Sequence, residues 1–445
     1  MEATYGCGAR HTQVILLFLS VLLAYGMRVN MSVGIVAMTD KNTSPNPDVL
    51  TFEWDDQSII LTSFFIGYVI PQVIAGHLAK NFGAKIFITV TSIVGSLMAV
   101  LIPVVAPLGS WAVIVCRVIQ GLAQGFLYPC IHNLLSKWVP PLERARLGTF
   151  VYAGGPLGTV VSMPFTGWIS GTHLGWPYAF YIYGGAGLLW TVLWMVLGKN
   201  SPADYKAMNP TEKEYIELSL GAIPAERLPS KTPWAAFFKS LPVWALIFAH
   251  SGQSWGFSTL ITNIPTYMAD ILHFDIKSNG VLSAGPYLLN WIVTISSGAL
   301  IDYVISKKYL SVGVARKVAN SVGLCIPAIT LVTLGLISGP DTDIRNVALA
   351  LLFVSVGANG SVLCGYHVNH MDLSPVYAGT LMGITNSVAN FCGTVAPLLV
   401  HFIVTEPGNP MQWAIVFYIS SAVYVIGSVV FVVFGSGEIQ AWNNG

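Results

Sequence analysis

Charged residues are scarce in this sequence of 445 residues. Only 9% of the positions are Asp, Glu, Lys or Arg, whereas a soluble domain has about 25%. The 21 basic and 20 acidic residues leave a formal net charge of +1, so the chain has no basic excess with which to bind nucleic acid. Hydrophobic residues fill 54% of the positions, and the mean hydropathy is +0.66. These values exclude a soluble enzyme and a disordered chain, and they predict a protein that resides in the lipid bilayer.

Patterns that would bind a metal or a redox cofactor are also lacking. The six cysteines include no CxxC pair, and five of them lie in apolar runs, where cysteine packs as a small hydrophobe. His367 and His370 have an i, i+3 spacing that suits a metal, but no carboxylate or thiolate in reach completes a site. The sequence therefore predicts no metal and no cofactor.

Apolar segments of spanning length recur along the chain. The run at 14–24 resembles the core of a signal peptide, but it resumes past Arg28 to Ala37, so we interpret it as a retained first helix. Breaks at glycine, proline and charge clusters predict an all-α membrane protein with twelve transmembrane helices. The predicted spans lie near 13–37, 57–79, 86–105, 110–136, 147–170, 177–198, 241–268, 279–304, 317–337, 346–370, 377–404 and 411–434.

One long polar interval, residues 200–239, separates the first six spans from the last six. It predicts an N-terminal six-helix bundle at 1–198, a cytoplasmic linker at 199–240 and a C-terminal six-helix bundle at 241–445. Within the linker, the segment 209–214 has the pattern of a helix start followed by a short surface helix. Paired six-helix repeats are typical of secondary transporters, which bind substrate near the middle of the membrane between the two halves.

The basic residues predict the orientation of the chain. Sixteen of the 21 lie in segments assigned to the cytoplasm, two lie inside the membrane, and only Lys41, Lys277 and Arg345 lie on the opposite face. This bias predicts cytoplasmic termini. Asn42 begins the sequon Asn42-Thr43-Ser44 in the first loop of the opposite face, where a glycan can be attached. The alternative is an unused sequon.

Two arginines interrupt the apolar spans. Arg28 lies about 10 residues from the outer end of the first span, and Arg117 lies about a third of the way into the fourth. A central arginine costs roughly 2.5–3.5 kcal/mol on insertion scales, and no Asp or Glu lies within a predicted span core to compensate it. Because the planar guanidinium suits carboxylate or phosphate, we predict an anionic substrate as the missing partner. The alternative is that both arginines bond helix carbonyls and water.

The fourth span carries a polar stripe. Its members are Arg117, Gln120, Gln124, Tyr128 and His132, which lie within roughly 120° of one another if the helix is uninterrupted. Such a stripe predicts a water-accessible pathway, with hydrogen bonding between helices as the alternative. His132 lies near the cytoplasmic end and is a candidate coupling or gating residue. A packed interfacial histidine is the other reading of this position.

Uncharged polar residues, mostly in the second half, can line a cavity without adding charge. We single out a set that combines these residues with the polar members of the first half. The predicted substrate contacts are Arg28, Arg117, Gln124, Tyr128, Gln253, Tyr287, Asn290, Asn369 and Asn386.

Four segments, in order along the chain, carry a specific resemblance. They are Arg28-Val29-Asn30-Met31-Ser32-Val33, Lys137-Trp138-Val139-Pro140-Pro141-Leu142-Glu143-Arg144, Asn369-His370-Met371-Asp372 and Gly435-Ser436-Gly437-Glu438. These segments resemble the major facilitator superfamily, and specifically its anion transporter family of sialin, vesicular glutamate transporters and type I sodium-phosphate cotransporters. The stretch 252–257, followed by 265–268, resembles the insect branch labelled as inorganic phosphate cotransporters. The resemblance covers nearly the whole chain.

The resemblance implies two six-helix bundles around a central site, with alternating access from the two faces of the membrane. Arg28 matches the family's substrate-binding arginine, Arg117 matches an arginine of the glutamate carriers, and His132 matches a histidine near the inner end of the fourth span. The chain departs from the family at Gln124, where proton-coupled members have a glutamate. It departs again at Gln253, where glutamate carriers have an arginine. These departures argue against glutamate as the substrate and against proton coupling through a carboxylate.

We therefore predict a secondary active anion transporter, not an enzyme, that carries inorganic phosphate or a small organic anion by cation-coupled symport. Sodium is the first expectation for the coupling ion, and a proton carried by His132 or another membrane histidine is the other. One alternative is a potential-driven or proton-linked organic anion carrier of a vesicular or lysosomal membrane. A more distant alternative, a membrane-embedded transferase, would need a carboxylate centre that the predicted spans lack. We expect a monomer in the plasma membrane or in an endolysosomal or vesicular membrane.

Overall fold

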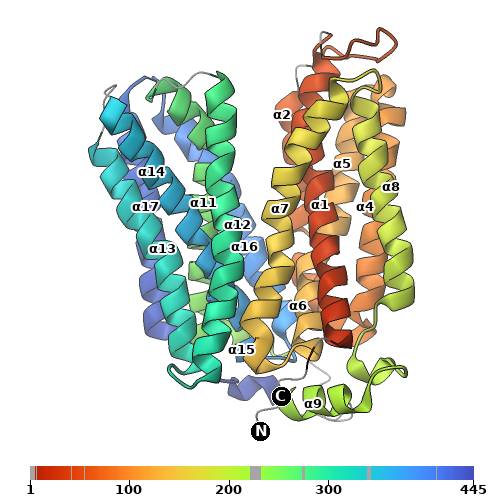
Figure 1. Cartoon of the computed structure of the whole chain (residues 1–445), viewed down its shortest axis with the longest axis vertical. Coiled ribbons are helices and arrows are strands. Elements are labelled where there is room, and N and C mark those ends of the chain that lie inside the picture. The colour runs from red at the N-terminus through yellow and green to blue at the C-terminus, as the bar shows by residue number, and fades with distance from the viewer. Residues whose placement is uncertain are drawn as a thin grey trace. The chain divides into compact units, whose positions relative to one another are not determined.

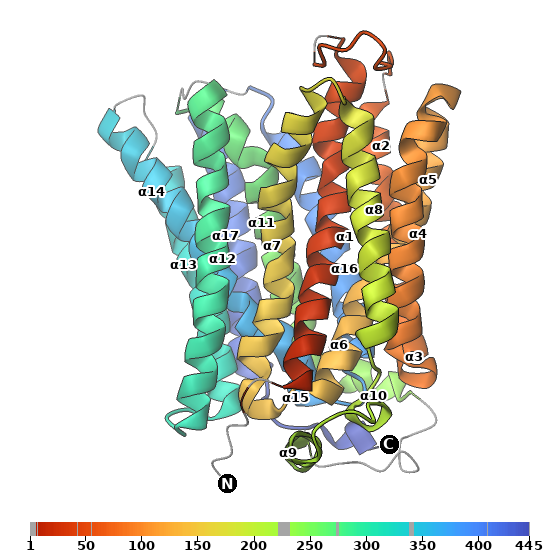
Figure 2. The ribbon, with the colours of Figure 1, turned by 45° about the vertical axis from the view of Figure 1, so that its right-hand side comes forward.

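The computed structural model of the chain describes residues 6, 8–41, 43–54, 56–220, 232–272, 276–337, 342–406 and 408–444. The predicted glycosylation site, Asn42, lies outside the described residues. Within these ranges the regular structure is helical, and no β-strand occurs (Figures 1 and 2).

The helices can be followed from red to blue in Figure 1. In the first half they are α1 (Ala9–Thr39), α2 (Gln57–Val69), α3 (Gln72–Phe82), α4 (Ala84–Val105), α5 (Ser110–Gln124), α6 (Leu127–Trp138), α7 (Arg144–Ser170), α8 (Trp176–Leu197), α9 (Pro210–Leu220) and α10 (Trp234–Lys239). In the second half they are α11 (Leu241–Asp270), α12 (Ile276–Ser306), α13 (Val312–Leu336), α14 (Thr342–Asn359), α15 (Tyr366–Leu373), α16 (Ala378–Ile403) and α17 (Pro410–Phe434). The 3-10 segment η5 (Gly360–Cys364) joins α14 to α15.

Each of the twelve predicted spans contains helix. Among the described residues, nine helical segments are long and apolar enough to cross a membrane, and the bent pair α2 and α3 makes a tenth. The two remaining predicted spans are occupied by α7, with 27 residues, and α11, with 30. At 1.5 Å per residue these helices are about 40 and 45 Å long, which exceeds the roughly 30 Å hydrocarbon core of a bilayer.

Two spans are broken next to a proline that cannot donate a backbone hydrogen bond. The pair α2 and α3 bends by 44° at Pro71, whose nitrogen cannot bond the carbonyl of Gly67. In the fourth span, α5 ends at Gln124 and α6 begins at Leu127, two residues before Pro129. The fourth span is therefore not the uninterrupted helix that we assumed for the polar stripe, and the stripe is divided between two helices.

The exposed helix faces carry large apolar side chains. Val36 is 59% exposed, Leu189 66% and Phe402 75%, while the polar members of the fourth span are at most 9% exposed. In a bilayer, exposed apolar faces meet lipid, and every backbone polar group is bonded within its helix. The arrangement is that of a multi-pass membrane protein.

The chain forms two compact units. Unit 1 comprises Met1–Pro140, Val151–Ala222 and Tyr377–Gly383, and unit 2 comprises Pro141–Phe150, Ile223–Val376 and Ile384–Gly445. Each unit thus contains one short segment whose neighbours in the sequence belong to the other unit. These are residues 141–150, which belong to unit 2, and residues 377–383, which belong to unit 1.

Glycines explain why residues 377–383 belong to unit 1. A Cβ atom at Gly76 of α3 would lie 2.3 Å from the carbonyl oxygen of Gly379 in the first turn of α16. A Cβ atom at Gly379 would lie 2.4 Å from the carbonyl oxygen of Pro129, and one at Gly383 would lie 2.2 Å from that of Gln72. Only residues without a Cβ let helix backbones approach so closely. The start of α16 is therefore packed directly against α3 and α6.

Residues 141–150 are held in unit 2 by α12. The Asp302 carboxylate accepts the backbone N–H of Ala145 at 3.0 Å through Oδ1 and that of Arg146 at 2.6 Å through Oδ2. A Cβ atom on Gly298, one turn earlier, would lie 2.1 Å from Oγ1 of Thr149. The first N–H groups of a helix have no intrahelical acceptor, and a carboxylate there is favourable. Asp302 therefore caps α7 from another helix.

The linker helix α9 is attached to the beginning of α1, as Figure 2 shows. The Glu212 carboxylate accepts the backbone N–H of Ala9 at 2.8 Å and that of Arg10 at 3.1 Å, and it pairs with Arg10 Nη1 at 3.0 Å. The two side chains are 2% and 0% exposed. The helix confirms the prediction of a helix start near residue 209, and its attachment to α1 was not predicted.

Candidate functional site

Arg28 lies in unit 1 within an aromatic cage. Its guanidinium carbon is 4.6 Å from the ring centroids of Tyr25 and Tyr68 and 4.7 Å from that of Phe64. Tyr25 is three positions before Arg28 on α1, and Phe64 and Tyr68 are four apart on α2, so each pair shares one helix face. The electron-rich faces of the rings stabilise a cation. Nε of Arg28 has no hydrogen-bond partner among the described residues.

Arg117 lies on α5 beside the same cage. Its guanidinium carbon is 4.8 Å from the Phe64 centroid, so one ring contacts both arginines. Nη1 donates to Oε1 of Gln120 at 2.8 Å, and Nη2 donates to the carbonyl oxygen of Arg28 at 3.5 Å. The residue is 2% exposed. Arg117 thus makes a helix carbonyl contact of the kind expected of a structural arginine, and it also adds a second positive charge to the cage.

A series of tyrosine side chains leads from the cage to His132. The hydroxyls of Tyr25 and Tyr128 are 3.0 Å apart. The Tyr128 ring stacks on that of Tyr152 with centroids 5.2 Å apart, and the Tyr152 hydroxyl is hydrogen-bonded to Nδ1 of His132. His132 is fully buried on α6. The candidate coupling residue is therefore connected to Arg28 through side chains of unit 1.

The structure brings together several of the substrate contacts predicted in the first half. Arg28, Arg117 and Tyr128 lie in the cage or in the tyrosine series beside it. Gln124 is 1% exposed, and its Nε2 donates to the carbonyl oxygen of Ala24 on α1 at 3.3 Å. This hydrogen bond joins α5 to α1. It is an example of the hydrogen bonding between helices that we gave as the alternative explanation of the polar stripe.

Gln253 lies in a polar network of unit 2. Its Nε2 donates to Oδ1 of Asn359 at 3.2 Å, and its Oε1 accepts from the Tyr366 hydroxyl at 3.3 Å. Nδ2 of Asn359 donates onward to the carbonyl oxygen of Gly323 at 3.0 Å. The network links α11 to the C-terminal end of α14 and the start of α15. A glutamine at this position is thus held by amide and hydroxyl groups that would not compensate the charge of an arginine.

Three other predicted contacts lie elsewhere in unit 2. Nδ2 of Asn290 donates to the carbonyl oxygen of Val356 at 2.7 Å, which joins α12 to α14. Oδ1 of Asn386 accepts from Nδ2 of Asn390 at 3.0 Å, within α16. The Tyr287 hydroxyl has no hydrogen-bond partner in the part of the chain that the structure describes. Of the three, Tyr287 retains an unused polar group.

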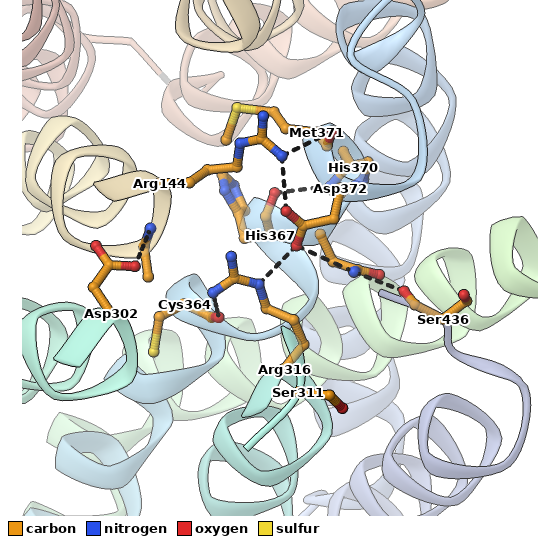
Figure 3. Close-up of polar contacts among 12 residues, drawn as sticks. Arg144, Asp302, Ser311, Arg316, Cys364, His367, His370, Met371, Asp372 and Ser436 are labelled. Carbon is orange, nitrogen blue, oxygen red and sulfur yellow. Dashed lines mark hydrogen bonds and ion pairs between the residues drawn. The ribbon is translucent and has the colours of Figure 1, made fainter. Parts of the chain in front are cut away.

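Asn369, the last predicted contact, belongs to a different cluster. Its Nδ2 donates to the carbonyl oxygen of Ser436 at 2.9 Å and lies 3.4 Å from Oδ2 of Asp372. It is fully buried. Its amide therefore links α15 to the segment after α17, next to a buried ion cluster (Figure 3).

That cluster consists of Asp372 between two arginines, Arg144 of α7 and Arg316 of α13. Oδ1 of Asp372 is 2.9 Å from Nη1 of Arg144, and Oδ2 is 2.7 Å from Nε of Arg316. Arg144 also donates to the carbonyl oxygen of Met371, and Arg316 to that of Cys364, both at 3.2 Å. The three charged side chains are at most 4% exposed. Within unit 2, the cluster thus connects the first residue of α7 to α13 and α15 through buried ion pairs.

Sequence reasoning missed the cage and the ion cluster. Tyr25, Phe64 and Tyr68 are ordinary residues for apolar spans, and only their helical spacing around Arg28 would have signalled a cage. Asp372 was visible in the segment Asn369-His370-Met371-Asp372, but its position at the end of a predicted span concealed its pairing with arginines far away in the sequence.

The amino-acid sequence is similar to those of a known protein family. The family model described as Major Facilitator Superfamily matches residues 16–397. A Drosophila melanogaster protein named "Putative inorganic phosphate cotransporter" is 39% identical, over 98% of this chain and 86% of that protein. Human sialin is 37% identical over 98% of this chain and 91% of its own length. Human vesicular glutamate transporter 2 is 35% identical over 98% and 76%.

A solved structure shows the same fold. The proton:xylose symporter XylE, a major facilitator superfamily protein bound to 6-bromo-6-deoxy-D-glucose, superposes with a TM-score of 0.70 over 97% of this chain and 98% of its own, at 13% identity. That identity is low enough that the likeness speaks for the fold alone. The fold class predicted from the sequence, two six-helix bundles of the major facilitator type, is confirmed. The chain belongs to the major facilitator superfamily and, within it, to the family of sialin and the vesicular glutamate transporters.

Proposed function

We propose that this protein is a secondary transporter of a small anion, either inorganic phosphate or a small organic anion, which binds at Arg28 with Arg117 beside it. The observation that carries the proposal is the cage in unit 1. Two guanidinium groups contact one phenylalanine ring, and neither forms an ion pair with a carboxylate among the described residues.

Apart from Arg117, the fully buried arginines among the described residues are paired. Arg10 has a glutamate oxygen at 3.0 Å, and Arg144 and Arg316 have aspartate oxygens at 2.9 and 2.7 Å. A buried charge without a partner is costly, and the fold supplies partners to these three. The negative charge that would pair with Arg28 and Arg117 is then best supplied by a ligand.

The aromatic rings do not replace such a ligand. A cation–π contact is worth about 0.5–2 kcal/mol and stabilises the positive charge, but a ring face does not satisfy the five in-plane N–H donors of a guanidinium. A phosphate or carboxylate presents paired oxygens that match this fork. The cage therefore suits a ligand that adds hydrogen-bond acceptors and negative charge together.

The names of the relatives support the same substrate class, because phosphate and glutamate are both anions. Gln253, bonded to Asn359 and Tyr366, adds no positive charge in unit 2, so we favour phosphate or another anion over glutamate. For the coupling ion we retain sodium as the first expectation, since it needs no titrating group. We further propose a monomer with cytoplasmic termini, in the plasma membrane or in a vesicular or endolysosomal membrane.

Uptake by purified protein in liposomes tests the proposal. Labelled phosphate and labelled glutamate should be offered separately under imposed sodium, proton and voltage gradients. We expect saturable phosphate uptake by the wild type and none by Arg28→Ala. Arg28→Lys keeps the charge but loses the bidentate fork, so its apparent affinity should fall sharply.

The matched control is Arg146→Ala, because this arginine side chain is 51% exposed. It should transport like the wild type. Normal uptake by a well-folded Arg28→Ala protein would overturn the site. Uptake of glutamate but not phosphate would keep the anion transporter and reverse our preference for the substrate.

A further inference from the structure

A short aromatic helix lies where the linker meets the second half of the chain. This helix, α10, covers Trp234–Lys239, and α11 begins two residues later at Leu241. Trp234 is 37% exposed and Phe238 is 55% exposed. The segment precedes the predicted span at 241–268, so its exposed rings are not accounted for by the hydrocarbon core of the bilayer. Neighbouring exposed aromatic side chains mark a surface that meets a partner or a membrane.

The opposite face of α10 fixes the helix to unit 2. Phe237 is fully buried, and its ring centroid lies 4.9 Å from that of Trp442 at an interplanar angle of 71°. Figure 2 accordingly shows α10 near the C-terminus. On the other side, Nε1 of Trp244 on α11 donates to the carbonyl oxygen of Phe238 at 2.9 Å. The bond satisfies one of the last carbonyl groups of α10, which have no partner within the helix. The two contacts determine which face of α10 points outwards.

The outward face combines aromatic, small and basic side chains. Trp234, Ala235, Phe238 and Lys239 are the exposed residues of α10, and they lie within an arc of roughly 140° around the helix axis. The other two residues of the helix lie on the opposite side. Aromatic rings and basic side chains occur together at the membrane–water interface, where the rings lie at the level of the lipid headgroups. The composition of this face is therefore that of an interfacial segment.

The face continues into the lipid-facing side of α11. Leu241, Trp244 and Phe248 are 56%, 40% and 42% exposed, and their i, i+3, i+7 spacing places them in one stripe along the helix. Val243, between them in the sequence, is 1% exposed. Because α11 occupies a predicted span, its exposed apolar stripe meets lipid. The hydrogen bond between Trp244 and Phe238 joins this stripe to the exposed face of α10.

The length of α11 places its first turn at the level of the headgroups. Its 30 residues extend about 45 Å, and a bilayer with both headgroup regions is about 40–45 Å thick. A typical tilt of about 20° shortens the span of such a helix by only a few ångströms. Both ends of α11 therefore reach the headgroup regions, and α10, which precedes its first residue, lies at that level.

We propose that Trp234, Phe238 and Lys239 of α10 form an interfacial anchor that binds the phospholipid headgroup region where α11 enters the membrane. The rings lie among the headgroups, and the ammonium group of Lys239 binds lipid phosphate. The occupant of this face is lipid because the face continues a stripe that already meets lipid. The inference does not depend on the anion proposed to bind at Arg28. It assigns a membrane contact to a segment that sequence analysis placed in a cytoplasmic linker.

Spin labels in proteoliposomes test the anchor by measuring depth. Single cysteines are introduced by Phe238→Cys, Phe248→Cys or Glu214→Cys into a protein whose native cysteines are replaced by alanine. Oxygen concentrates in lipid and a nickel chelate stays in water, so the ratio of their collision rates with the label reports its depth. Phe248→Cys on α11 is the lipid reference, and Glu214→Cys on the exposed surface of α9 is the water reference. We expect the ratio for Phe238→Cys to lie between the two references, several-fold above that of Glu214→Cys.

Anionic lipid tests the contact made by the lysine. A larger fraction of phosphatidylserine should move the ratio for Phe238→Cys towards the Phe248→Cys reference, because a basic residue is attracted to an anionic surface. Lys239→Gln should abolish this shift, and a shift that survives it would overturn the phosphate contact. A ratio for Phe238→Cys equal to the water reference would overturn the anchor. So would low access of both reagents, since that result would show a face covered by protein.

A substitution in the protein with its native cysteines gives an independent test. Phe238→Asp should lower the apparent melting temperature in lipid nanodiscs, and more so in anionic lipid, because a negative charge replaces a ring among the headgroups. The matched control is Leu218→Asp, since Leu218 is 65% exposed and lies in the last turn of α9, as Phe238 does in α10. Substitution of a residue exposed to water changes stability little. The anchor is refuted if Phe238→Asp melts like this control in both neutral and anionic nanodiscs, and that result leaves the Arg28 assignment untouched.

Discussion

Removal of the Asp372 charge should destabilise the protein more than removal of either arginine bound to it. Asp372 is the common partner of Arg144, at 2.9 Å, and Arg316, at 2.7 Å, and the three side chains are at most 4% exposed. Asp372→Asn would leave two buried guanidinium groups without a carboxylate. Arg144→Gln, in contrast, would leave a one-to-one pair of Asp372 and Arg316.

The expected magnitudes follow from this difference. Removal of one partner of a buried ion pair costs about 3–5 kcal/mol, and Asp372→Asn should reach at least that range because it deprives two cations at once. Arg144→Gln should cost roughly 1.5–3 kcal/mol, the value of one hydrogen bond to a charged group. The carbonyl contact of Arg144 with Met371 at 3.2 Å would be lost in addition.

Apparent melting temperatures of the purified variants in detergent provide the assay. The control is Glu53→Gln, because the Lys41–Glu53 pair is 3.3 Å apart but 72% and 89% exposed, and such surface pairs contribute little. We expect Asp372→Asn to have the lowest apparent melting temperature and Arg144→Gln a higher one. The control and the wild type should have the highest. The reasoning is refuted if Asp372→Asn melts like the wild type, or if Arg144→Gln is the more damaging change.

Three further variants examine other contacts. Gly76→Ala should lower both melting temperature and uptake, because its Cβ would lie 2.3 Å from a carbonyl oxygen of α16, whereas Gly185→Ala, with no atom within 4 Å, should change neither. Gln124→Glu should add a new pH dependence to uptake, since a carboxylate on the arginine-bearing face of α5 repels an anion only when ionised; a pH profile identical to that of the wild type would contradict this. Glu212→Gln should speed proteolysis of the linker, and the exposed Glu217→Gln should not.

The positions of the helices were accessible from the sequence, but their breaks were not. Apolar runs placed helix in all twelve predicted spans, because the bilayer requires every backbone group to be bonded within its own segment. The positions of the prolines did not predict where the helices break. The spans at Pro71 and Pro129 are broken, whereas Pro156 and Pro164 lie inside the continuous helix α7. Neighbouring helices decide whether a proline interrupts a span, and the sequence does not show which helices are neighbours.

The same reason limits what could be known of the site. Arg28 and Arg117 stood out because their spans contain no acid, but a local search of this kind would also have missed the carboxylate that binds Arg144, which lies 228 residues away. Arg10 is 202 residues from its partner. The fold brings distant acids to these buried arginines and brings none, among the described residues, to the two in the aromatic cage. The absence of an acid is therefore informative only in the folded unit, where an unpaired guanidinium has a cost in stability that binding of an anion can offset.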